Sequence, residues 1–204
     1  MIALVDYGLG NIEAFANIYR RLGIEAWAAR TVDDLQRASR IILPGVGAFD
    51  WAMTRLQESG LREALDAQVL GAKKPVLGIC VGMQMMARSS EEGELPGLGW
   101  IDATVVKFDT AAFEGSTHLP HMGWNDTRPA STETLFSGLG MPRYYFLHSY
   151  FMQPDREETI LATSSYGVAF TAAVRSGNVY GTQFHPEKSH HWGVQLLKNF
   201  AELC

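Results

Sequence analysis

One short segment of the sequence, GICVG at residues 78–82, places a nucleophilic side chain between small residues. The pattern glycine-x-nucleophile-x-glycine is typical of a nucleophile elbow, a sharp turn from a strand into a helix, here with Cys80 in place of serine. The helix that follows directs its first amides and the positive end of its dipole toward the sulfur, so the amide of Val81 is placed to stabilise an oxyanion. Taken alone, the segment fits a small buried cysteine at a tight turn equally well.

A cysteine nucleophile needs a base, and the motif QFHPE at residues 183–187 offers one after an apolar run. Residues two apart on an extended chain point to the same side, so we expect His185 and Glu187 to hydrogen-bond while Phe184 faces the core. A surface histidine followed by a solvated glutamate is the commoner arrangement, but it seldom accompanies an elbow. The sequence therefore predicts a Cys80–His185–Glu187 triad.

A second glycine-rich segment, formed by Gly45, Val46 and Gly47, follows another apolar run. The carboxyl ends of parallel strands share one edge of a sheet, so we expect this loop beside Cys80. Its backbone amides can approach a tetrahedral intermediate closely and act as oxyanion donors. A plain strand-to-helix turn is the alternative interpretation.

Two more histidines, His190 and His191, follow the QFHPE motif, so a metal site that joins them to His185 and Glu187 has to be considered. Pro186 disturbs regular helical spacing there, and no cysteine-rich or acidic motif accompanies the group. We predict no metal. The segment DYGLGN (6–11) lacks the full glycine spacing of a dinucleotide fingerprint, so we also predict no nucleotide cofactor.

The elements that must position these residues alternate between strand and helix in the first half of the chain. Apolar runs typical of buried strands lie at residues 2–5, 24–29, 41–43 and 75–79, with Pro44-Gly45 expected to end the third. Helical spacing of apolar residues follows at 12–22, where Asn11 is the expected cap, at 49–69, and from about 82 to 87. This alternation predicts a parallel sheet with helices on both faces.

From about Trp100 the sequence changes to short β-rich segments and closes with an amphipathic helix near residues 194–201. The β-rich segments lie at 100–108, 144–147, 159–163, 168–174 and 179–184, and a hairpin turn is expected at 176–178. We predict one α/β domain over residues 1–204. It is a three-layer, open, mostly parallel sheet with an antiparallel β extension in the second half.

Composition excludes several classes of protein. The 204 residues are 47% hydrophobic and 19% charged, enough apolar material for a substantial core, and the net charge of -5 argues against a general nucleic-acid or anionic-membrane binder. The chain starts without a basic segment and has no apolar run of membrane-spanning length, so we expect a cytoplasmic protein. Cys80 and Cys204 suggest neither a disulfide framework nor a zinc site.

Seven segments, in order along nearly the whole chain, resemble class I (triad-type) glutamine amidotransferases. They are DYGLGN (6–11), LPGVGAF (43–49), GICVGMQ (78–84), SSEEG (89–93), PHMGWN (120–125), YYFLHSY (144–150) and GTQFHPEKS (181–189). The cysteine elbow with QFHPE is specific for the class. DYGLGN with PHMGWN is similar to the glutaminase subunits of imidazole glycerol phosphate synthases. The resemblance implies a flavodoxin-like fold and hydrolysis of L-glutamine without a cofactor.

The resemblance also implies a glutamine pocket beside the triad. Glu92 is expected to bind the α-ammonium group of glutamine. The other residues expected in the pocket are Gln84, His148, Ser149 and Tyr150.

A partner protein is a further implication of the resemblance. Asn11, Met122 and Trp124 would lie near the interface with a (β/α)8-barrel synthase subunit, which uses the ammonia in histidine biosynthesis. In this family, the oxyanion strand at residues 45–47 is expected to become active only when the loaded partner is bound.

Three alternatives stay open at this point. A paralogous glutaminase would supply ammonia for acetamidino sugars of bacterial surface polysaccharides, with the same chemistry and a different partner; SSEEGELPGLGW and DYGLGNIEAF fit there as well. A peptidase or another cysteine hydrolase is disfavoured by Gln84 and Glu92. A non-catalytic binding module is disfavoured because the complete triad is present.

Overall fold

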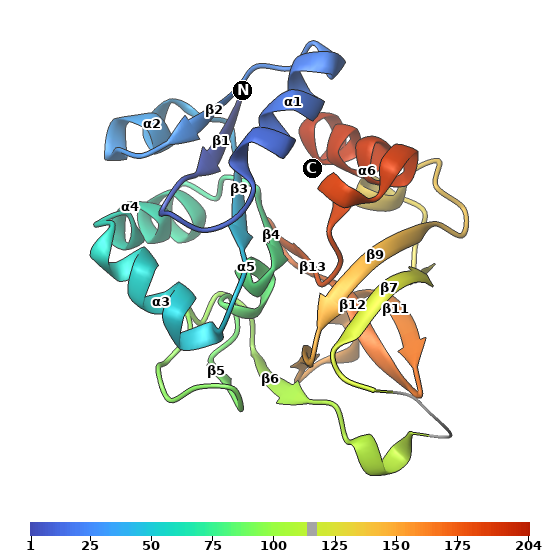
Figure 1. The fold of residues 1–204 in the computed structure, drawn as a ribbon. Coiled ribbons are helices and arrows are strands. Elements are labelled where there is room, and N and C mark those ends of the chain that lie inside the picture. The colour runs from blue at the N-terminus through green and yellow to red at the C-terminus, as the bar shows by residue number, and fades with distance from the viewer. Residues whose placement is uncertain (114–117) are drawn as a thin grey trace.

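The structure, a computed structural model, describes residues 1–113 and 118–204 (Figure 1). Its helices are α1 (Ile12–Leu22), α2 (Val32–Arg37), α3 (Phe49–Glu58), α4 (Arg62–Asp66), α5 (Val81–Gln84) and α6 (His190–Leu203). Its strands are β1 (Ile2–Val5), β2 (Ala26–Ala29), β3 (Arg40–Gly45), β4 (Val76–Cys80), β5 (Ser89–Ser90), β6 (Ala103–Lys107), β7 (His121–Asp126), β8 (Arg128–Pro129), β9 (Arg143–His148), β10 (Tyr150–Pro154), β11 (Ile160–Tyr166), β12 (Val168–Ser176) and β13 (Val179–Thr182). Short helical turns are η1 (Ala67–Gly71), η2 (Thr110–Ala112), η3 (Thr134–Phe136), η4 (Glu157–Thr159) and η5 (Pro186–Lys188).

The main sheet has the strand order β2-β1-β3-β4-β13-β12-β11-β8. The first five strands in this order, β2, β1, β3, β4 and β13, pair in parallel. The last three, β12, β11 and β8, extend the sheet with antiparallel pairs. Figure 1 shows α1 and α6 on one side of the parallel strands and α2, α3 and α4 on the other. The three-layer α/β fold with an antiparallel extension is therefore confirmed. Two smaller sheets, β10-β6-β5 and β7-β9, complete the second half.

Local signals in the sequence account for the first layers. β1 is buried along its whole length, as its unbroken apolar run predicts for a strand covered on both faces. Helix α1 begins where the Asn11 side chain accepts a hydrogen bond from the Ala14 amide, and it ends at Gly23 in the left-handed conformation with a φ of 70°. None of the helices in the described ranges is both long and apolar enough to cross a membrane.

Two predicted boundaries are wrong. β3 continues through Pro44 and Gly45, which pair with Ile79 and Cys80 of β4. Proline is tolerated there because the register of β3 with β1 ends at Ile42, so the missing N–H removes no bond on that side.

Helix α5 ends at Gln84, three residues before the predicted end. The backbone carbonyls of the next three residues, Met85, Met86 and Ala87, accept hydrogen bonds from the loop at residues 98–101, so these residues do not continue the helix.

Strand β7 is an element that the sequence did not predict, although it pairs along its full length with β9.

The turn from β4 into α5 is crowded against β3. Cys80 has φ 54° and ψ -113°, a positive φ that is rare for a residue with a side chain. A Cβ atom on Gly82 would collide with the Leu43 carbonyl oxygen, and one on Gly45 would collide with the Gly82 amide nitrogen. Only glycine at these two positions allows the helix to start this close to the neighbouring strand.

We therefore predict that Gly82→Ala destabilises the fold by about 2 kcal/mol or more, because the new methyl group meets rigid backbone. Gly71→Ala is the matched control, since a Cβ there meets no atom of the described residues within 4 Å. Urea unfolding of the two variants measures the difference. Equal stability of Gly82→Ala and the wild type would show that the elbow is not tightly packed.

Candidate active site

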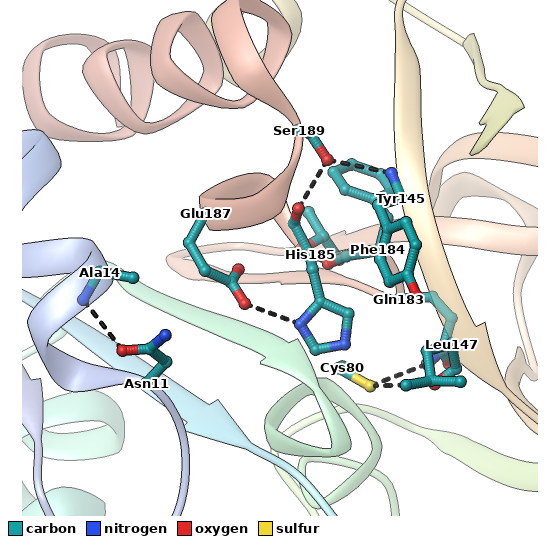
Figure 2. A network of polar contacts seen from close by, with 11 residues as sticks. Asn11, Ala14, Cys80, Tyr145, Leu147, Gln183, Phe184, His185, Glu187 and Ser189 are labelled. Carbon is teal, nitrogen blue, oxygen red and sulfur yellow. Dashed lines mark hydrogen bonds and ion pairs between the residues drawn. The ribbon is translucent and has the colours of Figure 1, made fainter. Parts of the chain in front are cut away.

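Cys80 ends β4 with its sulfur on a cavity of about 290 Å³ at the carboxyl edge of the parallel strands. Cys80 is 4% exposed. The thiol donates to the Leu147 carbonyl oxygen at 3.8 Å, and the Gln183 side-chain amide donates to the sulfur, also at 3.8 Å (Figure 2). The predicted nucleophile is thus held by one contact from β9 and one from the segment that follows β13.

His185 and Glu187 form a buried pair beside this sulfur. His185 Nδ1 lies 2.8 Å from Glu187 Oε1, and the two side chains are 3% and 4% exposed. Figure 2 shows the imidazole between the Glu187 carboxylate and the Cys80 sulfur. The predicted hydrogen bond, and the burial of Phe184 in the core, are confirmed.

The predicted extended conformation from His185 to Glu187 is wrong. Only His185 is extended, and its amide donates to the Tyr145 carbonyl. Pro186 then opens the turn η5, where its fixed φ fits and no N–H is needed. The Ser189 hydroxyl donates to the His185 carbonyl oxygen at 2.6 Å and accepts from the Tyr145 amide at 3.0 Å, which fixes the turn.

The surroundings of His185 favour its charged form. Burial lowers the pKa of this imidazole, but hydrogen bonds and charge interactions with Cys80 and Glu187 outweigh burial and raise the pKa to about 10. The imidazole is therefore protonated at neutral pH when Cys80 is a thiolate. A protonated imidazole in this position can act as a general acid toward a group bound at Cys80.

The predicted oxyanion donors lie around Cys80, although not all of them line the cavity. Val81 is the first residue of α5, and the first amides of a helix have no partner within it. Val46 and Gly47 line the cavity and are exposed to solvent, while Gly45 is buried in β3 opposite Cys80. The Tyr7 hydroxyl donates to the Pro44 carbonyl oxygen at 2.8 Å and so supports the strand that leads into this loop.

All five residues expected at the glutamine pocket line the cavity: Gln84, Glu92, His148, Ser149 and Tyr150. The Gln84 side-chain amide donates to the Tyr150 carbonyl and to Gln183 Oε1, both at 3.0 Å. These bonds occupy its NH2 group, so only its oxygen is available to a ligand. Glu92 Oε2 accepts a hydrogen bond of 2.9 Å from the Phe49 amide at the start of α3.

Two buried histidines connect this cavity to β7. His148 Nδ1 lies 2.9 Å from the Tyr150 carbonyl oxygen, which can only accept, so this nitrogen carries the proton. His148 Nε2 then accepts from His121 Nδ1 at 3.0 Å, and His121 Nε2 accepts from Asn125 at 3.3 Å. Burial lowers the pKa of His121 to about 4 and that of His148 to about 3, which agrees with two neutral rings.

The residues expected at the partner interface are exposed. Met122 and Trp124, on the same face of β7, are 62% and 41% exposed, and Asn11 caps α1 at the surface. The Trp124 ring stacks on His190 at the start of α6, with 5.2 Å between ring centroids. Residues of α1 and of the QFHPE motif lie close to one another, because Ile18, Arg21 and Glu187 line the same surface pocket.

The side chains considered for a metal site are engaged elsewhere. His185 and Glu187 bind each other, and His190 stacks on Trp124. In residues 1–113 and 118–204, no group of three or more histidine, cysteine, aspartate or glutamate side chains is arranged to hold a metal ion.

The sequence analysis did not predict a role for three residues that contact or support the site. Gln183 contacts the sulfur directly, and its position two residues before His185 in the QFHPE motif was a usable signal. Tyr7 and His121 act through buried hydrogen bonds to segments far away in sequence. No local spacing indicates such bonds.

Comparison with known proteins places this geometry in a family. Residues 3–203 match the family described as "Glutamine amidotransferase class-I". The chain is 57% identical to the imidazole glycerol phosphate synthase subunit HisH of Bdellovibrio bacteriovorus and 48% identical to subunit HisH 2 of Pseudomonas aeruginosa. In both comparisons the whole of each chain is covered.

Solved structures share the fold. A putative GMP synthase protein from Thermoplasma acidophilum matches with a TM-score of 0.72 at 23% identity, covering 98% of this chain and 91% of that one. A structure described as a glutamine amidotransferase matches with a TM-score of 0.71 at 22% identity, covering 97% and 98%. The family match over nearly all residues, together with full-length relatives, shows that this chain belongs to the class I glutamine amidotransferases.

Proposed function

We propose that this chain is the glutaminase subunit of an imidazole glycerol phosphate synthase. Residues 1–204 act as one glutaminase domain that hydrolyses L-glutamine to glutamate and ammonia and passes the ammonia to a barrel-type synthase subunit. The observation that carries the chemistry is the buried His185–Glu187 pair beside the Cys80 sulfur on an open cavity. The full-length relatives with that printed name support the choice of synthase.

Attack on glutamine begins with the Cys80 thiolate. His185 takes the thiol proton, and the sulfur adds to the carboxamide carbon to give a tetrahedral oxyanion. The Val81 amide, at the start of α5, stabilises that oxyanion together with an amide from the loop at residues 45–47. The imidazolium then protonates the leaving nitrogen, the carbon–nitrogen bond breaks, and ammonia departs from a glutamyl thioester on Cys80.

The second half-reaction releases glutamate. A water molecule attacks the thioester carbonyl while His185 accepts its proton, and the carbon–sulfur bond breaks to return the proton to Cys80. Glu187 holds the imidazole through Nδ1, so Nε2 faces the sulfur in both halves. Gln183 donates to the sulfur and therefore stabilises it each time it carries negative charge.

Recognition of glutamine uses the far end of the cavity. The Glu92 carboxylate binds the α-ammonium group, and the Gln84 oxygen and the segment at residues 148–150 position the rest of the substrate. Because the Gln84 NH2 group is fixed by two internal bonds, this side chain presents an acceptor in a defined orientation.

The partner is expected on the face that carries Asn11, Met122 and Trp124. Two exposed large apolar side chains on one face of a strand are typical of a surface that another protein covers. The solvent-exposed loop at Val46 and Gly47 is free to change conformation when the loaded synthase binds.

Cys80→Ala is predicted to lower glutamine-dependent synthesis by roughly a thousandfold or more, because no other group can form the thioester. Synthesis from added ammonium salt with the barrel subunit should stay unchanged, since the acceptor chemistry belongs to the partner. Steady-state rates with each nitrogen source measure both effects. If the ammonium-dependent rate falls as well, the proposed division of labour between the two proteins is wrong.

A pH titration tests the activation of His185. The pKa of about 10 lies above the ordinary value of 6.5, so the charged imidazole stabilises the fold fully below about pH 6.5, and this stability is lost as the pH rises toward 10. We predict that Glu187→Gln lowers the titration midpoint of His185 by roughly one to three pH units, because a negative partner is removed. NMR titration of the His185 ring measures it. His121 and His148 are internal controls, and they should stay neutral throughout this range.

A further inference from the structure

The loop that carries Glu92 is fixed by a residue outside the pocket. Asp50 lies in the first turn of α3, and its carboxylate accepts hydrogen bonds from the Glu94 amide at 2.9 Å and the Leu95 amide at 3.0 Å. Between Glu92 and these amides, a Cβ on Gly93 would collide with Asp50 Oδ1. The Asp50 carboxylate therefore holds the loop that directly follows Glu92, and its closeness to the backbone requires glycine at position 93.

Glu92 is joined to the same helix from the other side. The cap residue of α3, Ala48, offers no side-chain hydrogen bond, and the Phe49 amide donates to Glu92 Oε2 instead. The Glu92 carboxylate thus acts as the N-terminal cap of the helix that follows the loop at residues 45–47. Asp50 accepts hydrogen bonds from the loop at residues 92–95, and Glu92 of that loop accepts one from the first turn of α3, so the two segments are linked in both directions.

We propose that Asp50 is a positioning residue that sets recognition of the α-amino group of the substrate. This inference rests on the proposed function, in which Glu92 binds the α-ammonium group of glutamine. Asp50 does not line the cavity. It acts through the loop, because loss of its two bonds frees the Glu94 and Leu95 amides and lets the Glu92 carboxylate move away from the substrate.

Loss of the two Asp50 hydrogen bonds should affect only reagents that carry an α-amino group. An amide or alkylating agent without an α-amino group makes no bond to Glu92, so the position of that carboxylate does not affect its reaction with Cys80. A reagent with the α-amino-acid group needs the carboxylate in place. Asp50 should therefore control the preference between the two kinds of reagent, whereas general damage to the fold would slow both.

Competing alkylation of Cys80 tests this on the chain alone. Azaserine, a glutamine analogue, carries the α-amino-acid group, and iodoacetamide does not. In Asp50→Ala we expect the labelling rate by azaserine to fall by about tenfold or more, the size typical for loss of a charge-assisted hydrogen bond, while the rate with iodoacetamide stays within about twofold of the wild type. Mass spectrometry of the Cys80 peptide measures both rates.

Two further variants sharpen the test. Gly93→Ala should show the same selective loss, because its methyl group displaces the loop from Asp50. Asp33→Ala removes an exposed acid from the first turn of a different helix, α2, and should leave both rates unchanged.

The outcomes separate the inference from the function on which it rests. Equal loss with both reagents in Asp50→Ala, or no loss with either, would overturn the role of Asp50 while wild-type labelling by azaserine still supports a glutaminase. A wild type that shows no preference for azaserine over iodoacetamide would contradict α-amino recognition altogether, and the inference with it.

Discussion

The close approach of α5 to β3 is the constraint on which the rest of the site depends. Gly82 lies against the Leu43 carbonyl and Gly45 against the Gly82 amide, with no room for a side chain at either position. This contact turns the chain sharply after β4 and holds Cys80 at a positive φ. The sulfur, the first amides of α5 and the loop after β3 consequently meet at one edge of the sheet.

The second half of the chain supplies the groups that surround this sulfur. β13 adds in parallel to β4 and delivers Gln183, His185 and Glu187, while β9 contributes the carbonyl of Leu147. β9 also pairs with β7, whose outer face carries Met122 and Trp124. The strand that contacts the nucleophile is therefore bonded directly to the expected partner surface, which gives a short structural route between partner binding and catalysis.

Local patterns in the sequence predicted the fold class, the triad and the oxyanion loop, whereas the glutamine-pocket residues were expected only from the resemblance to a family. Strands that are buried on both faces need apolar residues throughout, so their unbroken apolar runs identify them in the sequence. The elbow and QFHPE motifs together contain the three triad residues. Interactions between distant segments were not predictable in the same way. The carbonyls of Met85 and Met86 leave α5 for the loop that contains Leu98, and Asp50 binds amides more than forty residues away. The partners in these hydrogen bonds are set by tertiary packing, and the local pattern of residue types does not predict it.

The most direct test of a partner-gated glutaminase is glutamate release from glutamine, measured for this chain alone and after addition of the barrel synthase subunit with its phosphoribulosyl ligand. We expect slow release by the chain alone and strong stimulation by the loaded partner, because in the proposed function the exposed loop at Val46 and Gly47 completes the oxyanion site only in the complex. Negligible release with the loaded partner, while Cys80 still reacts with iodoacetamide, would contradict the assignment to this synthase and favour the paralogous supply of ammonia to acetamidino sugars.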